Sequence, residues 1–397
     1  MTTYEQFTGA VSLASNSPGV PTGYGVQAKL VVDRMMRHGI DVAALSNYGT
    51  EGQMSSYESP FGTVPVYPRG LTLYSADVIK PYHERHLAGR EIKNFVMTLY
   101  DVWVYAGQKG LDSGLDFVSW TPLDHLTIPP NVLAWCKQSN VHPLAMSPFG
   151  QRTFETAGIE STYIPHAVDT SLYKPTFEIE GVEVKKYFGL KESDFVVGMV
   201  AANKANGQIH RKAFAENLLA FAWFKKNHPN AYLYIHADPG KHYGGFDLAN
   251  LAKAIGIDME SILFPDPERY RFGYTDEEMA ALYTGMDVLL QASYGEGFGV
   301  PAIEAQACGT RVIGSNWAAS QDLVSEDGWL VEGQPFWDEA QFSWFQIPLV
   351  PSIHAALEEA YKANRGVSET ALEFGKQFDV EAVWDQYWMP FLRSRFA

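Results

Sequence analysis

The chain has 397 residues, 46% of them hydrophobic, which is enough for about two domains with full hydrophobic cores. The net charge of -16 argues against a general nucleic-acid-binding surface, although residues 1–165, with 11 Lys/Arg against 14 Asp/Glu, are nearly neutral. The two cysteines, Cys136 and Cys308, do not suggest a disulfide framework or a zinc site, and we expect both to be buried. We see no signal peptide and no run of about 18 apolar residues, so we expect a cytoplasmic protein without a transmembrane segment.

Short apolar runs alternate with amphipathic segments in the first half, the pattern of a parallel sheet covered by helices. The predicted strands are residues 10–14, 41–46, 95–100, 117–120, 143–147 and 162–165. A glycine-rich loop follows the first strand and leads into an amphipathic helix that ends near His38. Ligands in such folds bind beyond the carboxyl ends of the strands, so Gly23, Tyr24 and Gly25 form a candidate cradle for a phosphate or a sugar.

A histidine-containing cluster, Tyr82-His83-Glu84-Arg85-His86, falls in a segment predicted as loop and helix. Its two histidines are three positions apart, whereas the metal-binding pattern His-Glu-x-x-His places them four apart. We therefore favour a solvated helix face over a metal site.

Polar residues follow two later strands of the first half, at Asp101 and at Asp124-His125. We expect ligands of this domain to gather there. His125 would titrate near neutrality and contact a sugar hydroxyl with Asp124 nearby. The alternative is that Asp124 caps the next segment while His125 packs in a loop.

The second domain begins near Asp194 with a buried strand over residues 195–200. Further strands are predicted at residues 231–236, 262–264, 287–292 and 311–314. After the first of these strands come Asn203-Lys204, a loop, and Arg211-Lys212 at the start of a helix. Cations over a helix start and a loop can pair with a leaving diphosphate, and the alternative is a solvated helix start.

A glycine-rich turn, Tyr294–Val300, joins the strand at 287–292 to a helix. Pro301 suits the first helical turn, and Gly309 suits the helix end. Such a turn directs free backbone N–H groups toward an anion above the sheet. Glu296 lies on the turn, and Glu304, about one turn into the helix, leans back over the same pocket.

The string Glu-Gly-Phe-Gly-x-Pro-x-x-Glu-Ala that starts at Glu296 resembles the signature of retaining glycosyltransferases of family 4. This family has the GT-B fold, in which two Rossmann-like parallel-sheet domains face each other across a cleft and the last helix returns to the first domain. The resemblance implies that Glu304 holds the ribose hydroxyls of a nucleotide-sugar donor. It implies that Glu296 and the backbone amides that follow hold the donor sugar, and these amides belong to Gly297, Phe298, Gly299 and Val300.

The same resemblance assigns roles elsewhere in the chain. The glycine-rich loop at residues 23–25 would face the donor diphosphate and the acceptor, and a histidine such as His125 often contacts the acceptor or sugar. Lys212 matches the family's phosphate-binding lysine, whereas Asn203 stands in the place of the usual arginine. Arg211 or Lys204 would then supply the missing charge.

The resemblance also sets the predicted domains. These are an acceptor domain at 1–170, a linker at 171–193, a donor domain at 194–378, and a helix at 379–397 that packs back on the first domain. A partner-binding helix is the alternative for this last segment. The hinge segment 163–169 carries Ala167 where the family has glycine, and Trp317–Asp322 replaces the family's Gly-Gly-x-x-Glu segment.

The leading hypothesis is a retaining glycosyltransferase that moves a hexose or pentose from a nucleotide-diphosphate sugar to a hydroxyl acceptor. The resemblance implies no metal and no cofactor, with a UDP- or GDP-sugar as the favoured co-substrate. The acceptor is open between a saccharide, a glycolipid head group, a protein side chain and a modified nucleic-acid base. The alternatives are a GT-B glycoside phosphorylase and a catalytically silent nucleotide-sugar-binding module.

Overall fold

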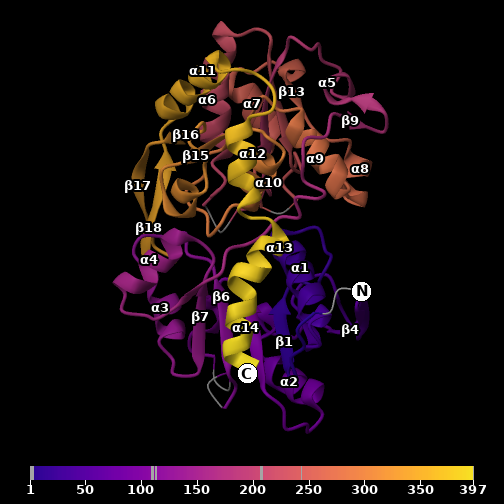
Figure 1. Cartoon of the computed structure of the whole chain (residues 1–397). Helices are drawn as coiled ribbons and strands as arrows, with labels where there is room; N and C mark the ends of the chain where they lie inside the picture. The colour runs from indigo at the N-terminus through magenta and orange to yellow at the C-terminus, as the bar shows by residue number, and fades with distance from the viewer. Residues whose placement is uncertain (1–3, 109–110, 112–113, 206–208, 243, 397) are drawn as a thin grey trace. The chain divides into compact units, whose positions relative to one another are not determined.

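The computed structural model in Figure 1 describes residues 4–108, 111, 114–205, 209–242 and 244–396. The chain divides into two compact units, each built on its own parallel sheet. Unit 1 comprises Met1–Ala167, Glu339–Ser343 and Val380–Ala397, and unit 2 comprises Val168–Asp338 and Trp344–Asp379.

Unit 1 is built on an eight-stranded sheet in the order β3-β4-β2-β1-β5-β6-β7-β8, parallel except where β3 meets β4. Its strands are β1 (Ala10–Ser15), β2 (Asp41–Ser46), β3 (Ser55–Ser59), β4 (Gly62–Tyr67), β5 (Asn94–Leu99), β6 (Phe117–Thr121), β7 (Val141–Ala145) and β8 (Thr162–Tyr163). The six predicted strands of this half are present. From β1 the chain first adds strands on one side and then returns to add β5 on the other. The direction of winding therefore reverses between β1 and β5.

The helices of unit 1 are α1 (Gly23–Arg37), α2 (Ile79–Leu87), α3 (Pro130–Cys136), α4 (Pro148–Thr156), α13 (Val380–Val383) and α14 (Met389–Phe396). Thr22 caps α1, because its hydroxyl oxygen accepts the Gly25 N–H at 3.1 Å. Gly25 is required here, since a Cβ atom on it would lie 2.4 Å from the Val20 carbonyl oxygen. No such neighbour lies within 4 Å of a Cβ atom built on Gly23.

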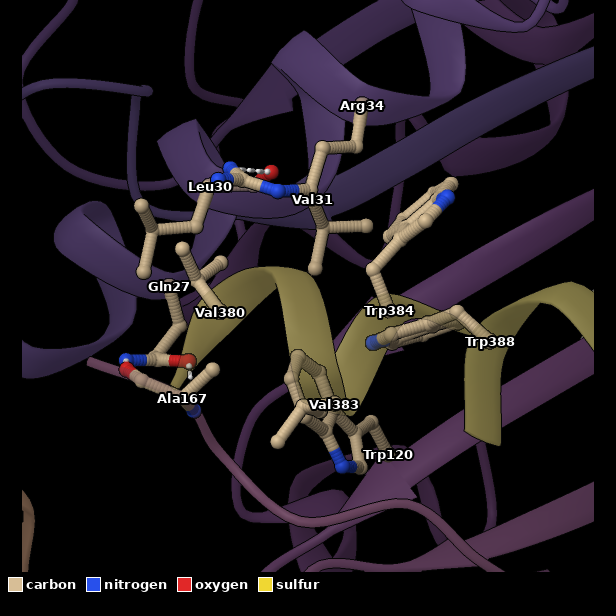
Figure 2. Close-up of a pocket in the computed structure, with 10 residues that line it drawn as sticks. All are labelled: Gln27, Leu30, Val31, Arg34, Trp120, Ala167, Val380, Val383, Trp384 and Trp388. Atoms are coloured by element: carbon tan, nitrogen blue, oxygen red, sulfur yellow. Dashed lines mark hydrogen bonds between the residues drawn. The ribbon is translucent and has the colours of Figure 1, made fainter. Parts of the chain in front are cut away.

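The C-terminal segment packs within unit 1, which confirms its predicted return to the first domain (Figure 1). A π-helical turn, Trp384–Trp388, joins α13 to α14. The Trp384 indole N–H donates to His38 at 3.0 Å, and the Trp388 ring packs edge-on against Trp120 at 5.2 Å. Glu381 forms ion pairs with Arg34 and Arg37 of α1. The indole rings of Trp120, Trp384 and Trp388 line a small cavity of about 10 Å³ (Figure 2).

The prediction that residues 82–86 form a solvated helix face is wrong for the two histidines of α2. His83 and His86 are buried, and each ring hydrogen-bonds the Ser12 hydroxyl, at 2.8 Å and 3.0 Å. Burial lowers the pKa of His83 below its ordinary value. The helix therefore turns both histidines inward toward β1, while Glu84 and Arg85 remain exposed.

Unit 2 is built on a six-stranded parallel sheet in the order β13-β12-β11-β14-β15-β16. Its strands are β11 (Phe195–Val200), β12 (Ala231–His236), β13 (Ile262–Leu263), β14 (Val288–Gln291), β15 (Val312–Ser315) and β16 (Trp329–Val331). Two hairpins pair β9 (Glu178–Ile179) with β10 (Val182–Glu183), and β17 (Gly333–Asp338) with β18 (Ser343–Pro348). The winding reverses between β11 and β14, which are neighbours in the sheet.

The helices of unit 2 are α5 (Val184–Tyr187), α6 (Phe214–Asn227), α7 (Leu248–Ile255), α8 (Pro267–Phe272), α9 (Asp276–Thr284), α10 (Val300–Ala307), α11 (Val350–Lys362) and α12 (Glu369–Lys376). Aromatic and aliphatic side chains of α6 and α11, such as Phe221 and Leu357, share one buried core with β11 and β12. Thr275 caps α9 in a reciprocal capping box with Glu278.

Candidate active site

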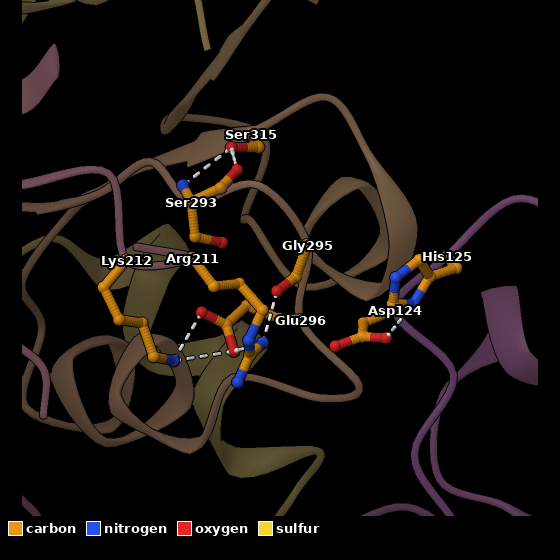
Figure 3. Close-up of polar contacts among 8 residues, drawn as sticks. All are labelled: Asp124, His125, Arg211, Lys212, Ser293, Gly295, Glu296 and Ser315. Carbon is orange, nitrogen blue, oxygen red and sulfur yellow. Dashed lines mark hydrogen bonds and ion pairs between the residues drawn. The ribbon is translucent and has the colours of Figure 1, made fainter. Parts of the chain in front are cut away.

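A charged cluster lies at the winding reversal of unit 2, which is where open α/β sheets bind their ligands. Glu296 comes from the loop after β14, and Arg211 and Lys212 come from the loop after β11. The Glu296 carboxylate accepts hydrogen bonds from Lys212 Nζ at 2.7 Å and 2.9 Å and from Arg211 at 3.1 Å (Figure 3). The structure thus brings together three residues that the sequence analysis singled out from segments some 84 positions apart.

The electrostatics of this cluster favour an anionic ligand. Glu296 is only 4% exposed, and a buried carboxylate is costly unless it is paired. Two cations meet this one carboxylate, so the three side chains together carry a net charge of +1. Arg211 and Lys212 keep 27% and 24% of their side chains exposed, so solvent and solutes still reach them.

Backbone and side-chain hydrogen bonds hold the glycine-rich turn in place. The Tyr294 N–H donates to the Arg211 carbonyl at 2.8 Å, and the Arg211 guanidinium donates to the Gly295 carbonyl. Ser315 of β15 fixes the end of β14, because its hydroxyl accepts the Ser293 N–H at 2.9 Å and donates to the Ser293 carbonyl (Figure 3).

The turn ends at Gly299, whose φ of 100° lies in the left-handed region that favours glycine. Pro301 occupies the first turn of α10, as predicted. The Phe298 side chain is buried and packs edge-on against Phe378 at 5.7 Å. Its side chain therefore stabilises unit 2, and only its backbone is available to a ligand. The predicted roles of the amides of Gly297 and Val300 stay predictions.

Glu304 lies on α10 as predicted, in a setting that the sequence did not reveal. Its carboxylate accepts a hydrogen bond from the Tyr283 hydroxyl of α9 at 2.7 Å. Burial raises the pKa of Glu304 to about 7, although the Tyr283 hydroxyl acts in the opposite direction. The carboxyl group can therefore both donate to and accept from a ligand hydroxyl near neutral pH. The sequence around Tyr283 does not indicate this contact, because only the tertiary packing of α9 against α10 brings Tyr283 to Glu304.

Asn203 is a positioning residue rather than an exposed donor. Its buried side-chain amide donates to the carbonyls of Asp238, Gly240 and Phe246 at 2.8–3.1 Å, and its oxygen accepts the Phe246 N–H at 2.9 Å. Its amide is thus occupied by backbone groups, and its predicted role at the phosphate stays a prediction. Lys204 is exposed and forms an isolated bridge with Gly244. Arg211 is the cation that joins Lys212 at the cluster.

The predicted residues of unit 1 lie at the start of α1 and in the segments after β5 and β6. His125 is buried, and its Nδ1 atom lies 2.6 Å from the Asp124 carboxylate (Figure 3). Tyr24 lies in the first turn of α1, and its ring meets the Tyr100 ring at 6.4 Å. Asp101 begins the short 3-10 helix Val102–Tyr105.

The described part of the chain contains no group of three or more His, Cys, Asp or Glu side chains arranged to hold a metal ion. Among the described helices, none combines the length and the apolar character needed to cross a membrane. Cys136 and Cys308 are free and buried, as expected.

Comparison with known proteins agrees with the site in unit 2. Residues 247–342 match the family model "Glycosyl transferases group 1". The chain is 29% identical over 196 residues to D-inositol 3-phosphate glycosyltransferase of Corynebacterium urealyticum, covering 45% of this chain and 43% of that protein. It is 39% identical over 90 residues to the enzyme of the same name from Salinispora arenicola, covering 22% and 18%. The chain thus matches less than half the length of these relatives.

Solved structures resemble the whole chain. Sucrose-phosphate synthase from Thermosynechococcus elongatus aligns over 98% of both chains with a TM-score of 0.70 at 16% identity. Anabaena Alr3699/HepE, solved with UDP and glucose, aligns over 97% of this chain and 99% of that one, with a TM-score of 0.62 at 18% identity. These likenesses show the GT-B fold. Together with the family match, they show a chain of GT-B fold whose segment 247–342, which carries the Glu296–Glu304 signature, is similar to the group 1 glycosyltransferases.

Proposed function

We propose that this protein is a retaining glycosyltransferase that moves a sugar from a nucleotide-diphosphate sugar to a hydroxyl acceptor. The observation that carries this proposal is the cluster of Glu296, Arg211 and Lys212 at the winding reversal of unit 2. The cluster combines a fixed carboxylate with an excess of positive charge next to the start of a helix.

The two cations would stabilise the diphosphate as it leaves. When the bond between the sugar and the diphosphate breaks, negative charge develops on the departing phosphate oxygen. Fixed cations and backbone N–H groups lower the energy of that charge without reorganising. Arg211 and Lys212 supply such cations, and the N-terminus of α10 supplies N–H groups and a positive dipole end. With the charge-stabilising role taken by side chains of the protein, we propose a metal-independent reaction.

The sugar keeps its anomeric configuration when the acceptor hydroxyl attacks from the side of the leaving group. Its proton then passes to the departing phosphate oxygen, so no protein group has to act as a general base. Glu296, held by its two cations, would accept hydrogen bonds from hydroxyls of the donor sugar. Glu304 would hold the ribose hydroxyls, and its pKa of about 7 suits a group that accepts and donates hydrogen bonds.

UDP is the first nucleotide to test, because the HepE structure holds UDP and glucose. The names of the curated relatives point to D-inositol 3-phosphate as one acceptor to compare. Two alternatives remain distinct from the main proposal. A glycoside phosphorylase would use inorganic phosphate and would have no need of a ribose contact at Glu304. A silent binding module would hold the donor without turnover.

Donor hydrolysis tests the proposal before the acceptor is known, because water can replace the acceptor slowly. The enzyme is incubated with UDP-α-glucose and with GDP-α-mannose, and the released sugar is followed by proton NMR before it mutarotates. We expect slow release of the α-anomer. Initial release of the β-anomer would contradict retention. Binding of a donor without any release would favour the silent module.

A further inference from the structure

A second cluster of side chains lies at the winding reversal of unit 1, between β1 and β5. Tyr24 follows β1 and Tyr100 follows β5, and their rings meet edge-on at 6.4 Å. Reversal points of open α/β sheets bind ligands because the loops on either side diverge there. This position in unit 1 corresponds to that of the Glu296 cluster in unit 2, but its side chains are aromatic rather than charged.

The aromatic cluster has a buried floor and a partly exposed rim. The Tyr74 ring packs edge-on against Tyr100 at 5.6 Å and against Trp103 at 6.1 Å. Tyr24, Tyr74 and Trp103 are partly exposed, whereas Tyr100 and Tyr105 are buried. The Tyr105 hydroxyl is buried, and no hydrogen-bond partner for it occurs among the described residues. Burying a hydroxyl without a hydrogen bond costs free energy, unless a ligand or an ordered water supplies the partner.

Tyr74 is held in a strained backbone conformation. Its φ of 58° and the φ of 57° at Ser75 lie in the left-handed region, which non-glycine residues rarely occupy. The surrounding loop fixes this geometry. Asp77 accepts the Leu71 N–H at 2.9 Å and the Thr72 hydroxyl at 2.6 Å, while the Ser75 hydroxyl accepts the Gly70 N–H at 3.1 Å. Strained residues persist where the structure over-determines them, and they concentrate at ligand-binding sites.

The charge beside the rings is negative. Asp101 lies close enough to Tyr74 that burial and this carboxylate together raise the pKa of the Tyr74 hydroxyl, which therefore stays protonated and able to donate. Among the described residues of the loops that contribute the rim (16–23, 68–78 and 100–108), the basic side chain is Arg69, and it pairs with Glu51 at 3.4 Å. Within their described residues, these loops thus offer hydroxyl donors and a carboxylate, and no unpaired cation for a phosphate.

We propose that the cluster of Tyr24, Tyr74 and Trp103, together with Asp101 near Tyr74, is a subsite for an unphosphorylated carbohydrate ring, with Tyr74 as a specificity-determining residue. This inference rests on the proposed function, since it names the class of the acceptor. The C–H face of a sugar ring packs against aromatic faces, whose electron density attracts its weakly positive hydrogens. The Asp101 carboxylate accepts hydrogen bonds from ring hydroxyls and repels a phosphate.

Direct binding of small probes tests the subsite without turnover. Methyl α-D-glucopyranoside and myo-inositol are compared with glucose 6-phosphate and D-inositol 3-phosphate by isothermal titration, on the full chain in the presence of UDP. We expect the neutral probes to bind and the phosphorylated ones to bind more weakly. In Tyr74→Ala the Kd of a bound neutral probe should rise about 2- to 12-fold, the range of one aromatic contact. Tyr74→Phe should keep most of the affinity, because it keeps the ring.

Phe61→Ala is the matched control, because Phe61 is an exposed aromatic residue of unit 1 at the β3–β4 turn. If Tyr74→Ala fails to fold by circular dichroism, Trp103→Ala takes its place. Asp101→Asn should reduce the difference in Kd between glucose 6-phosphate and the neutral sugar. Tighter binding of phosphorylated probes, no binding of neutral probes, or an unchanged Kd in Tyr74→Ala would each overturn the inference. Nucleotide binding is a separate measurement. If neutral sugars bind at Tyr74 but no nucleotide binds to the protein, the proposed function is refuted and the subsite proposal stands.

Discussion

Replacing Lys212 by methionine separates the structural role of the charged cluster from its catalytic role. Methionine keeps most of the apolar stem and removes the ammonium group, which makes two hydrogen bonds to Glu296, at 2.7 Å and 2.9 Å. Arg211 remains at 3.1 Å, so the carboxylate keeps one partner. Removing one partner of a fully buried ion pair costs about 3–5 kcal/mol. Because Lys212 is 24% exposed and Arg211 remains, we expect a smaller loss of about 1–3 kcal/mol in the free energy of unfolding.

The catalytic loss should be larger than this structural one. Removing one fixed charge-stabilising group from an active site lowers kcat by about 10²- to 10³-fold. We therefore expect the initial rate of UDP release to fall by that factor in Lys212→Met, under conditions where the variant is fully folded. Urea unfolding measures the stability, and donor hydrolysis measures the rate.

A double variant tests the structural role. In Lys212→Met with Glu296→Gln, the buried carboxylate is gone, so stability should partly return while activity should not. Lys226→Met is the control, because Lys226 lies exposed at the other end of α6. If the double variant regains activity along with stability, or if Lys212→Met loses activity only in proportion to its unfolded fraction, then Lys212 has no role in leaving-group stabilisation.

Three further predictions concern single positions. Glu304 has a pKa of about 7 in the folded protein against 4.5 for an ordinary glutamate, so the folded state binds more protons between these values and stability falls as pH rises from about 4.5 to 7. Glu304→Gln should remove up to about 3 kcal/mol of that decline, measured by urea unfolding at pH 5 and pH 8, and an unchanged decline would contradict the raised pKa. Gly25→Ala should destabilise by about 1–3 kcal/mol because its Cβ atom meets the Val20 carbonyl, whereas Gly23→Ala should be nearly neutral in the same thermal melt. Asn203→Ala should cost about 1–3 kcal/mol by leaving three carbonyls without their donor, and no loss in urea unfolding would refute its positioning role.

The sequence predicted the strands of the sheet interiors well, because a strand buried on both faces is a continuous apolar run. The strands β11 and β12 have the predicted bounds for this reason. The hairpin β3–β4 was missed because it lies at the sheet edge, where β3 is mostly exposed and polar and gives no such run. Turn chemistry was also predictable locally, as Pro301 in the first turn of α10 shows.

Side-chain environments were harder to predict, because they depend on which elements meet in space. The inward rotation of His83 and His86 depends on Ser12, which lies more than 70 positions away. The backbone contacts of Asn203 and the Tyr283 hydroxyl at Glu304 are tertiary in the same sense. The pairing of Glu296 with Lys212 was accessible only through the resemblance to a known family, which placed both residues at one donor site.

Nucleotide binding at the Glu304 end of this site is the most direct test of the central claim. Thermal melts of the wild type, Glu304→Gln and the exposed control Glu326→Gln are compared with UDP, GDP, ADP and TDP, each with and without magnesium. A ligand at ~100-fold excess over its Kd should stabilise the folded state by about 2.7 kcal/mol. We predict that one diphosphate raises the melting temperature without metal, and that Glu304→Gln loses this shift while Glu326→Gln keeps it. Stabilisation by inorganic phosphate alone, or by no diphosphate at all, would contradict the assignment of this site to a nucleotide-sugar donor.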